Sequence, residues 1–571
     1  MKTLKLTAAK AISAAAEELF APATLSVEEV VEMLEYPPDG SMGDLALPCF
    51  KLSRTLRRAP AQIAEALAAA VKDPAFSSVE CVGGYLNFKK DAAAFSARIV
   101  NTVLAEGDRY GAPDLGKGKT VVLDYSSPNV AKPFHIGHLG TTVIGHSLKL
   151  LHEFAGYKCI GINHLGDWGT QFGKLIVAYK KWGNREEIEA GEIDALVALY
   201  VRFHAEAEAD PTLNDEARAA FTKLEQHDEE SLALWRWFIE LSLREYNKTY
   251  RMLGIDFDSY NGESFYTDKM PRQIEKIREA GLLEIDDGAS VVNLEKWNMP
   301  PCLILKRDGS TLYPTRDIAA AVYRKETYDF EKCIYVTSAG QCLHFAQWFK
   351  VLELMGYPWY EGLVHVPYGT VSIGGAKLAT RTGNVILLKD LFAQAIEKVG
   401  SIMKEKGAET ADNEATAEAV GVGAIVFYYL SNNRMRDINF LMEDALSFDG
   451  NTGPYAQYTY ARACSLLEKA GEGSGKSVAP IPMCAEESEL ARVLSLFPER
   501  VEAAIEEYEP SFITRYILDL CAAFNRFYHE CKILSAENAT ERENRLAFTR
   551  ATKTVLGRAL SLICMKTPEK I

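Results

Sequence analysis

A strand, a polar turn, a helix and a second strand follow one another between residues 120 and 162, and this order constrains the fold most. The run Thr120–Tyr125 is apolar and β-branched, which is typical of a strand. After Gly137 the apolar residues follow a helical spacing, which stops at Gly156. Lys158–Ile162 is a second short strand pattern. This spacing predicts a βαβ unit and therefore a parallel sheet.

Two histidines lie where the first strand passes into the helix. His135 and His138 are three residues apart, so on a helix they share one face. The start of a helix presents free backbone N–H groups and the positive end of its dipole, which suits an anion. Lys132 adds a cation just upstream, and Gly137 lets a bulky ligand approach the backbone. These residues predict binding of a nucleotide and stabilisation of charge on its phosphates.

The histidine pair taken alone supports two simpler interpretations. It would more often be two ordinary surface histidines, or a pair of metal ligands. The preceding strand, the Pro128-Asn129 turn, Lys132 and Gly137 together favour the nucleotide site. A second polar segment, residues 163–173, follows the second strand. Because ligands of parallel sheets bind at the carboxyl ends of strands, both segments predict one shared site.

Composition bounds the class of protein. The chain has 571 residues and a formal net charge of −15, so we expect several domains and no general affinity for nucleic acid, although a local basic face remains compatible. No apolar run is long enough to span a membrane, and the N-terminus predicts an amphipathic helix and no signal peptide. The 11 dispersed cysteines form no CxxC pair, which predicts reduced thiols, a cytoplasmic location and no metal site.

Three domains are expected from the pattern along the chain. Residues 1–112 mix helical and strand patterns and form a separate α+β module. Residues 113–392 contain the parallel sheet, interrupted at about 175–255 by an acidic helical insertion. Residues 393–571 predict an all-helical domain.

Several motifs resemble one family. HIGH preceded by SPNxAKPF is similar to the nucleotide-binding signature of class I aminoacyl-tRNA synthetases, and this longer form resembles the arginyl enzymes. The run HLGDWGTQFG at 164–173 resembles the same family. Gly83–Phe88 is similar to its N-terminal appended domain, and NTGPYAQYxxAR at 451–462 to its anticodon-binding domain. The resemblance covers nearly the whole chain in the family's domain order.

The resemblance implies a fold and an activity. The fold is an α/β, Rossmann-like catalytic domain with a parallel sheet, an α+β N-terminal domain that contacts tRNA and an all-helical anticodon-binding domain. The activity is that of an arginine–tRNA ligase, which joins L-arginine to tRNA(Arg) through an adenylate made from ATP, with Mg²⁺ accompanying the phosphates. Members usually need tRNA before they form the adenylate, and a monomer is the family default.

The resemblance also implies which residues act on ATP. His135, His138, Lys132, Lys377 and Arg381 are the expected catalytic residues, and His135, Gly137, His138, His344 and Lys377 the expected ATP-binding residues. The second signature of the class, KMSKS, stands here as Lys377-Leu-Ala-Thr-Arg381, with Thr380 in place of its second lysine. Lys132 or Arg381 is the expected compensating cation.

An arginine pocket is implied by five polar residues: Asn129, Glu263, Tyr313, Asp317 and Gln341. A guanidinium group has five N–H donors, so its pocket needs carboxylates and other acceptors. Each residue alone would more often be a surface or capping residue, and Asp317 would suit a helix N-cap. Their match in type and order to the family supports the pocket.

For tRNA, the implied contacts are Asn87, Phe88, Tyr455, Tyr458 and Arg462. Phe88 would stack on a base or pack in a core, and the tyrosines, together with Gln457, would equally suit helix packing. Two rival functions remain open at this point: another class I synthetase or nucleotidylyltransferase, and a non-catalytic tRNA-binding paralogue.

Overall fold

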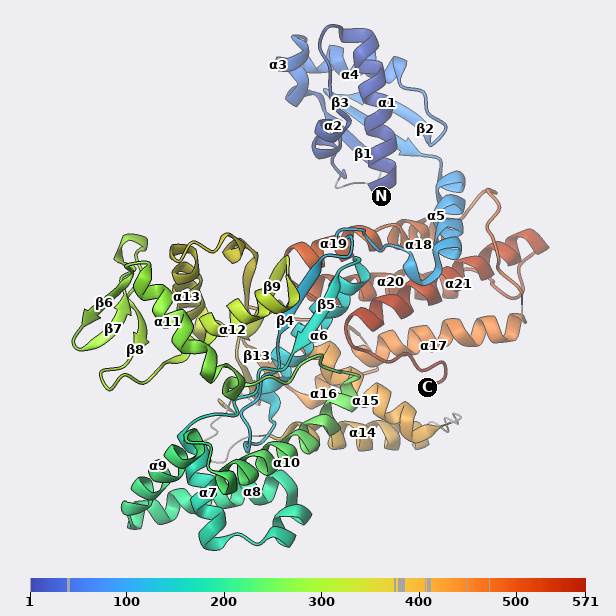
Figure 1. Ribbon diagram of the computed structural model, residues 1–571. Coiled ribbons are helices and arrows are strands. Elements are labelled where there is room, and N and C mark those ends of the chain that lie inside the picture. The colour runs from blue at the N-terminus through green and yellow to red at the C-terminus, as the bar shows by residue number, and fades with distance from the viewer. Residues whose placement is uncertain are drawn as a thin grey trace.

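The computed structural model describes residues 2–37, 39, 42–373, 376–377, 386–405, 407, 412–448, 450–471 and 473–571. A small N-terminal domain stands apart from the rest of the chain in Figure 1. A parallel sheet lies at the centre, a helical lobe and a small antiparallel sheet extend from it, and the C-terminal helices cover its other side (Figure 1).

The N-terminal domain is an antiparallel sheet of order β1-β3-β2 covered by helices. Its elements are α1 (Lys2–Phe20), α2 (Val27–Met33), β1 (Leu45–Pro48), α3 (Ser53–Leu56), α4 (Pro60–Ala70), β2 (Phe76–Val82) and β3 (Tyr85–Lys90). Gly83 and Gly84, both with positive φ, close the β2–β3 hairpin in two residues, as expected of a mirror-image turn. From this domain α5 (Ala92–Glu106) runs to the C-terminal helices, where it packs against α18 and α21.

The central sheet is parallel throughout and has the order β10-β9-β4-β5. The strands and their helices are β4 (Thr120–Asp124), α6 (Leu139–Phe154), β5 (Lys158–Ile162), α12 (Tyr313–Tyr328), β9 (Lys332–Ser338), α13 (Cys342–Leu354) and β10 (Leu363–Tyr368). The predicted βαβ unit is therefore confirmed. The strand order reverses between β4 and β9, so the crevice at their carboxyl ends is where such a sheet binds ligands.

Helix α6 joins the sheet to the C-terminal helices. The Thr141 hydroxyl donates to the carbonyl of Val336 in β9 at 2.6 Å, and the Ser147 hydroxyl donates to that of Leu562 at 2.7 Å. The helix is buried along most of its length. The segment that follows the two histidines is thus fixed from both sides.

Two insertions leave the sheet. The first is helical and consists of α7 (Thr170–Trp182), α8 (Arg185–Ala209), α9 (Thr212–Glu225) and α10 (Glu229–Leu253). The second contains α11 (Met270–Glu279) and an antiparallel sheet of β6 (Leu283–Asp286), β7 (Ala289–Val292) and β8 (Cys302–Leu305). After β8 the chain forms one antiparallel bridge, Leu305 to Thr311, before Tyr313 begins α12.

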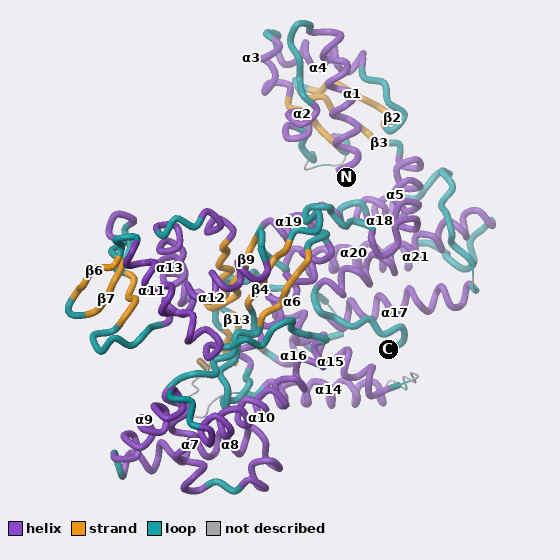
Figure 2. Tube along the Cα trace, in the orientation of Figure 1, coloured by secondary structure: helices purple, strands orange, loops and turns teal. Residues whose placement is uncertain are grey.

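Helices dominate the remainder of the chain (Figure 2). They are α14 (Leu388–Glu405), α15 (Asn413–Leu430), α16 (Met442–Ala445), α17 (Gly453–Ala470), α18 (Ala485–Leu494), α19 (Phe497–Glu506), α20 (Ser511–Glu530) and α21 (Ala539–Leu562). One strand, β13 (Ile438–Phe440), interrupts them and pairs with β11 (Val371–Ile373), which also pairs with β12 (Ala376–Lys377). Within the described residues, no helix combines the length and apolarity that crossing a bilayer requires.

A buried ion pair fastens α12 to the central sheet. Arg324 of α12 contacts the Asp124 carboxylate, the last residue of β4, at 2.8 Å, and its side chain is only 1% exposed. The other oxygen of Asp124 accepts a hydrogen bond from the Ser127 hydroxyl at 2.8 Å. One carboxylate therefore joins the strand end, the loop after it and α12.

Replacing Asp124 is expected to destabilise the domain of the parallel sheet strongly. In Asp124→Ala the Arg324 guanidinium stays buried without its partner, a change that typically costs about 3–5 kcal/mol. Thermal unfolding should show a clear fall in the transition midpoint. Glu331→Ala is the matched control, because it removes an exposed pair with Lys119 beside the opposite end of β4 and should change the midpoint little. Equal effects of both variants would contradict the role given to the buried pair.

Candidate active site

The loop between β4 and the two histidines has an unusual backbone. Ser126, Ser127 and Ala131 all have φ between 48° and 70°, the left-handed region that non-glycine residues rarely adopt. Three side chains hold this conformation from elsewhere. The Tyr250 hydroxyl lies 2.7 Å from that of Ser126, the Thr141 hydroxyl accepts from the Ser126 N–H at 3.0 Å, and Ser242 accepts from the Ala131 N–H at 3.0 Å. Strain maintained in this way is typical of functional loops.

The two histidines lie next to each other, with ring centroids 4.1 Å apart. His135 Nδ1 accepts the N–H of Gly137 at 3.0 Å, and His138 Nδ1 accepts the N–H of His135 at 3.2 Å. Because both Nδ1 atoms are acceptors, the proton of each neutral ring is on Nε2. Each ring thus has one N–H donor left for a ligand.

Burial keeps both rings uncharged. It lowers the pKa of His135 to about 4 and that of His138 to about 3; for His138 the neighbouring His135 and the Lys132 ammonium lower the pKa further. The histidines are therefore neutral donors near pH 7 and supply no positive charge. Any charge at this end of the site has to come from other residues.

The backbone around the histidines also differs from the expectation. A short 3₁₀ turn, Ile136–His138, precedes α6, and its N–H groups are used within the protein. The N–H of Ile136 donates to Ile386, that of Gly137 to His135 Nδ1, and that of His138 to the carbonyl of His135. The predicted anion site made of free backbone N–H groups is therefore wrong for this turn.

The expected cations have different positions. Lys132 is exposed beside the histidines, and its carbonyl accepts a hydrogen bond from Tyr246 at 2.8 Å. Lys377 lies in β12, paired with Ser372. Arg381 and Thr380 lie outside the described residues.

Glu263 is already paired with an arginine of the same chain. Its carboxylate lies 2.8 Å from the Arg316 guanidinium, and the two side chains are 16% and 14% exposed. Burial nevertheless raises the pKa of Glu263 to about 7, against the opposing effect of Arg316; Asp167 and Asp317 raise it further. The effect of burial on Glu263 is therefore larger than that of its arginine partner.

Asp317 and His344 form the neighbouring part of the site. His344 Nε2 lies 2.5 Å from the Asp317 carboxylate, which connects α12 to the start of α13. The expected N-cap role of Asp317 is wrong, because α12 begins four residues earlier with Pro314 in its first turn. Tyr313 is 66% exposed at the start of α12, and Gln341 is exposed where β9 passes into α13.

Asn129 lies across from the segment after β5. It forms a parallel bridge with Gly166, and a Cβ at Gly166 would stand 2.1 Å from its side-chain oxygen. Gly166 therefore lets the two segments approach closely. Trp168 packs against Phe221 and Trp235 of the helical insertion.

Three residues of the candidate site were not predicted from the sequence. Arg316 lies between Tyr313 and Asp317, and its place one residue before a predicted ligand was an available signal. Asp167, buried in the HLGDWG run, accepts both the N–H and the hydroxyl of Ser264. Tyr246 bonds the carbonyls of Asn129 and Lys132 from the distant α10, which no local pattern could reveal.

The N-terminal residues expected to contact tRNA differ in exposure. Asn87 lies half-buried on β3, whereas Phe88 is fully buried and packs against Phe76. Of the two interpretations of Phe88, its burial supports packing, since neither face of the ring reaches solvent.

The α17 residues form a linked group. Asn525 of α20 joins Tyr455 to Arg462, and the Arg462 guanidinium lies 5.0 Å from the ring centroid of Tyr458 and 4.9 Å from that of Tyr528. Tyr458 is 45% exposed and therefore available to a partner. Gln457 is fully buried and donates to the carbonyls of Ala419 and Lys566, so it has a packing role.

The buried histidines predict a loss of stability in acid. In an unfolded chain histidine has a pKa of about 6.5. Between pH 6.5 and 4, His135 and His138 are therefore protonated in the unfolded state but remain unprotonated in the folded state. The contribution of these two rings to stability should therefore fall as the pH falls through this window and level off below about pH 3. NMR of ¹³C-labelled histidine, assigned with His135→Gln and His138→Gln, should show no protonation of either ring above pH 5. A protonation step of either ring near pH 6.5 would contradict the neutral-donor role.

Three protein families match consecutive parts of the chain. The family model for the N-terminal domain of arginyl tRNA synthetase matches residues 6–89, that for the catalytic domain of class I (R) tRNA synthetases matches 99–442, and that for the DALR anticodon binding domain matches 456–571. The structure is similar over its full length to arginyl-tRNA synthetases from Thermus thermophilus (TM-score 0.82, 24% identity, covering all of that chain) and Plasmodium falciparum (0.78, 24%, covering 99%). These two likenesses show the fold.

Sequence similarity extends over nearly the whole chain. The arginine–tRNA ligase of Alkaliphilus metalliredigens is 50% identical over 95% of this chain and 96% of its own length, and that of Clostridium perfringens is 49% identical over 97% and 99%. Together with the catalytic-domain match, this similarity shows that the chain belongs to the arginyl-tRNA synthetases, the arginine–tRNA ligases among the class I aminoacyl-tRNA synthetases.

Proposed function

We propose that this chain activates L-arginine with ATP at the carboxyl edge of its parallel sheet and transfers the arginyl group to tRNA(Arg). One observation carries the assignment of the site. A buried carboxylate, Glu263, already holds a guanidinium at 2.8 Å, on the same sheet edge as the strained loop and the two neutral histidines.

Arginine would bind where Arg316 now pairs. The substrate guanidinium would lie against Glu263 and Asp317, and Arg316 would have to give up its contact with Glu263. Asn129 would hold the α-amino or carboxylate end, while the exposed Tyr313 and Gln341 border the entrance. An uncharged side chain could not replace Arg316 on Glu263, so it would gain no charge pairing in the pocket, which disfavours it.

The reaction needs positioning and electrostatics more than a protein nucleophile. An oxygen of the arginine carboxylate attacks the α-phosphorus of ATP, and pyrophosphate leaves. His135 and His138 would each donate an Nε2–H to phosphate oxygens, and Gly137 and His344 would border the nucleotide. Lys132, Lys377 and Arg381 would supply the positive charge that neutral histidines lack.

Mg²⁺ would accompany ATP through the phosphates. The carboxylates of the described site are already engaged: Glu263 with Arg316, Asp317 with His344, and Asp167 with Ser264. These residues therefore do not offer a cage for a hard cation, which suits Mg²⁺ bound mainly by water and substrate oxygens.

The outer domains would bind the tRNA. The proposal assigns residues 1–112 to tRNA contact through Asn87, residues 113–392 to catalysis, and 393–571 to the anticodon through Tyr455, Tyr458 and Arg462. At a net charge of −15, binding would depend on such local surfaces. A cytoplasmic monomer is part of the same proposal.

Charging a total tRNA pool with each labelled amino acid in turn, with ATP and Mg²⁺, tests the function. Arginine alone should be attached. Attachment of another amino acid would favour a different class I synthetase, and folded protein that binds tRNA without charging it would support the non-catalytic paralogue. Pyrophosphate exchange should require tRNA, as the proposal expects.

Glu263→Gln tests the pocket. Removing one partner of a buried charge contact costs about 2 kcal/mol or more, so kcat/KM for arginine should fall about 30-fold or further. Glu326→Gln is the matched control, since Glu326 lies on the exposed side of α12 and pairs weakly with Arg272 at 3.6 Å. Equal kcat/KM values in the two variants would overturn the assignment of Glu263.

Arginine binding should weaken in acid. The pKa of Glu263, raised by burial to about 7, means that its carboxylate is protonated below pH 7 in the free protein. A guanidinium binds the ionised form, so the Kd for arginine should rise about tenfold per pH unit below 7 and be constant above it. Equilibrium dialysis with labelled arginine measures this slope, which should vanish in Glu263→Gln and persist in Glu326→Gln.

A further inference from the structure

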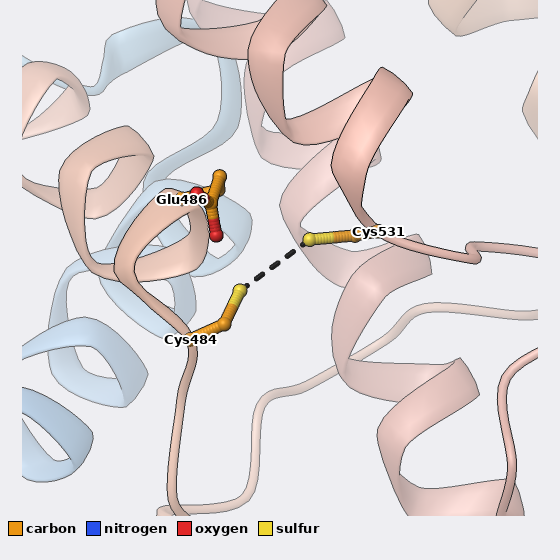
Figure 3. Close-up of side chains that lie close together, drawn as sticks. All are labelled: Cys484, Glu486 and Cys531. Atoms are coloured by element: carbon orange, nitrogen blue, oxygen red, sulfur yellow. Dashed lines mark hydrogen bonds between the residues drawn. The ribbon is translucent and has the colours of Figure 1, made fainter.

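Two cysteines and a glutamate meet in the C-terminal domain, apart from the sheet edge described above. Figure 3 shows Cys484, at the start of α18, directed toward Cys531, at the end of α20, with Glu486 beside them. The two Sγ atoms are 3.4 Å apart. One side-chain oxygen of Glu486 and both sulfurs all lie within 4.8 Å of one another.

A third helix holds both segments in place. Arg545 of α21 donates to the Glu487 carboxylate at 2.9 Å and to the carbonyl of Lys532, the residue after Cys531, at 2.9 Å. Glu487 in turn accepts the backbone N–H of Cys484 at 2.9 Å. Hydrogen bonds around a group of ligands fix their orientation in this way in metal sites.

The spacing of the donor atoms suits a tetrahedral cation. With Zn–S bonds of about 2.3 Å, two thiolates on one tetrahedral ion are about 3.8 Å apart, and a carboxylate oxygen lies about 3.5 Å from each sulfur. The observed 3.4 Å between sulfurs is close to this separation. Rotation of the half-buried Glu486 side chain supplies the remaining adjustment.

We propose that Cys484, Cys531 and Glu486 bind one thiophilic divalent cation of the Zn²⁺ type. Two thiols and one carboxylate are a donor set that such ions prefer to Mg²⁺ or Ca²⁺. Binding forms two metal–sulfur bonds and one metal–oxygen bond and releases the two thiol protons to solvent, without any change in oxidation state. Water supplies the fourth ligand, because the described residues include no fourth His, Cys, Asp or Glu in this group.

A divalent cation would neutralise most of the negative charge of its ligands. Two thiolates, a carboxylate and a divalent cation carry a net charge of −1, and the nearby Arg545 is itself paired with Glu487 and Glu541. The ion would link α18 to α20 within the helical domain, independently of the proposed function.

The sequence alone gives no sign of this site, and the proposal departs from our expectation that the chain has no metal site. The two cysteines are 47 residues apart, with no CxxC pair to indicate them. The alternative to metal binding is a disulfide between Cys484 and Cys531. It would require the sulfurs to approach to about 2.05 Å and would give Glu486 no role.

Metal titration of the full-length protein tests the proposal. The protein is reduced, treated with chelator, dialysed without metal and titrated with Zn²⁺ against a chromophoric chelator. We expect one ion per chain with a Kd of about 1 μM or tighter. Co²⁺ in place of Zn²⁺ should give a thiolate-to-cobalt charge-transfer absorption.

The variants separate this site from the other nine cysteines. Cys484→Ser and Cys531→Ser should each lower the affinity about 100-fold or more and remove the charge-transfer band, and Glu486→Gln should weaken binding while keeping the band. Cys464→Ser, a buried cysteine of α17 in the same domain, is the matched control and should bind like the unaltered protein.

A measurement on the unaltered protein tests the proposal without requiring that the variants fold. Zn²⁺ should slow alkylation of Cys484 and Cys531, located by mass spectrometry, and leave that of the exposed Cys342 unchanged. The proposal is overturned by reduced protein that binds no ion at these concentrations, by binding that survives Cys484→Ser and Cys531→Ser, or by alkylation rates that Zn²⁺ does not alter.

Discussion

The Asp124–Arg324 ion pair is the contact on which the arrangement of the active site depends. Asp124 ends the central strand β4, and Arg324 comes from α12, the helix with Tyr313, Arg316 and Asp317. The same carboxylate accepts from Ser127 in the strained loop before the histidines. The two halves of the site, one after β4 and one on α12, are thus fixed relative to each other through one buried charge. Such a pair contributes more to geometry than to net stability, because burying both charges is itself costly.

Burial also decides what the histidine signature can do. Rings so little hydrated do not hold a proton near pH 7, and their Nδ1 atoms are committed to the backbone of the same turn. What remains is a pair of fixed dipolar donors that needs no reorganisation when charge develops on a phosphate. Positive charge for the phosphates must then come from other residues than the two rings.

The fold followed from local patterns wherever one pattern was strong. The β-branched run at Thr120 predicted β4, the helical spacing after Gly137 predicted α6, and the parallel sheet is confirmed. The start of α12 was misjudged because Pro314 suits the first turn of a helix, whereas Asp317 only resembled a cap. The motifs predicted which residues form the site, but they did not predict the protonation or the pairing of those residues. That His135 is neutral, that Glu263 is already paired and that Tyr246 supports the loop all depend on contacts between distant segments, which sequence spacing does not contain.

The Arg316–Glu263 contact has a consequence for how strongly a substrate can be held. If arginine takes the place of Arg316, binding exchanges one guanidinium for another on the same carboxylate. The affinity then reflects the difference between two nearly equal attractions, and not the full strength of either. An exchange of this kind favours moderate affinity and rapid release, while the carboxylate is never left facing an empty, poorly hydrated space. A lysine side chain, with a compact ammonium in place of a planar fork, would be the poorer replacement in such an exchange.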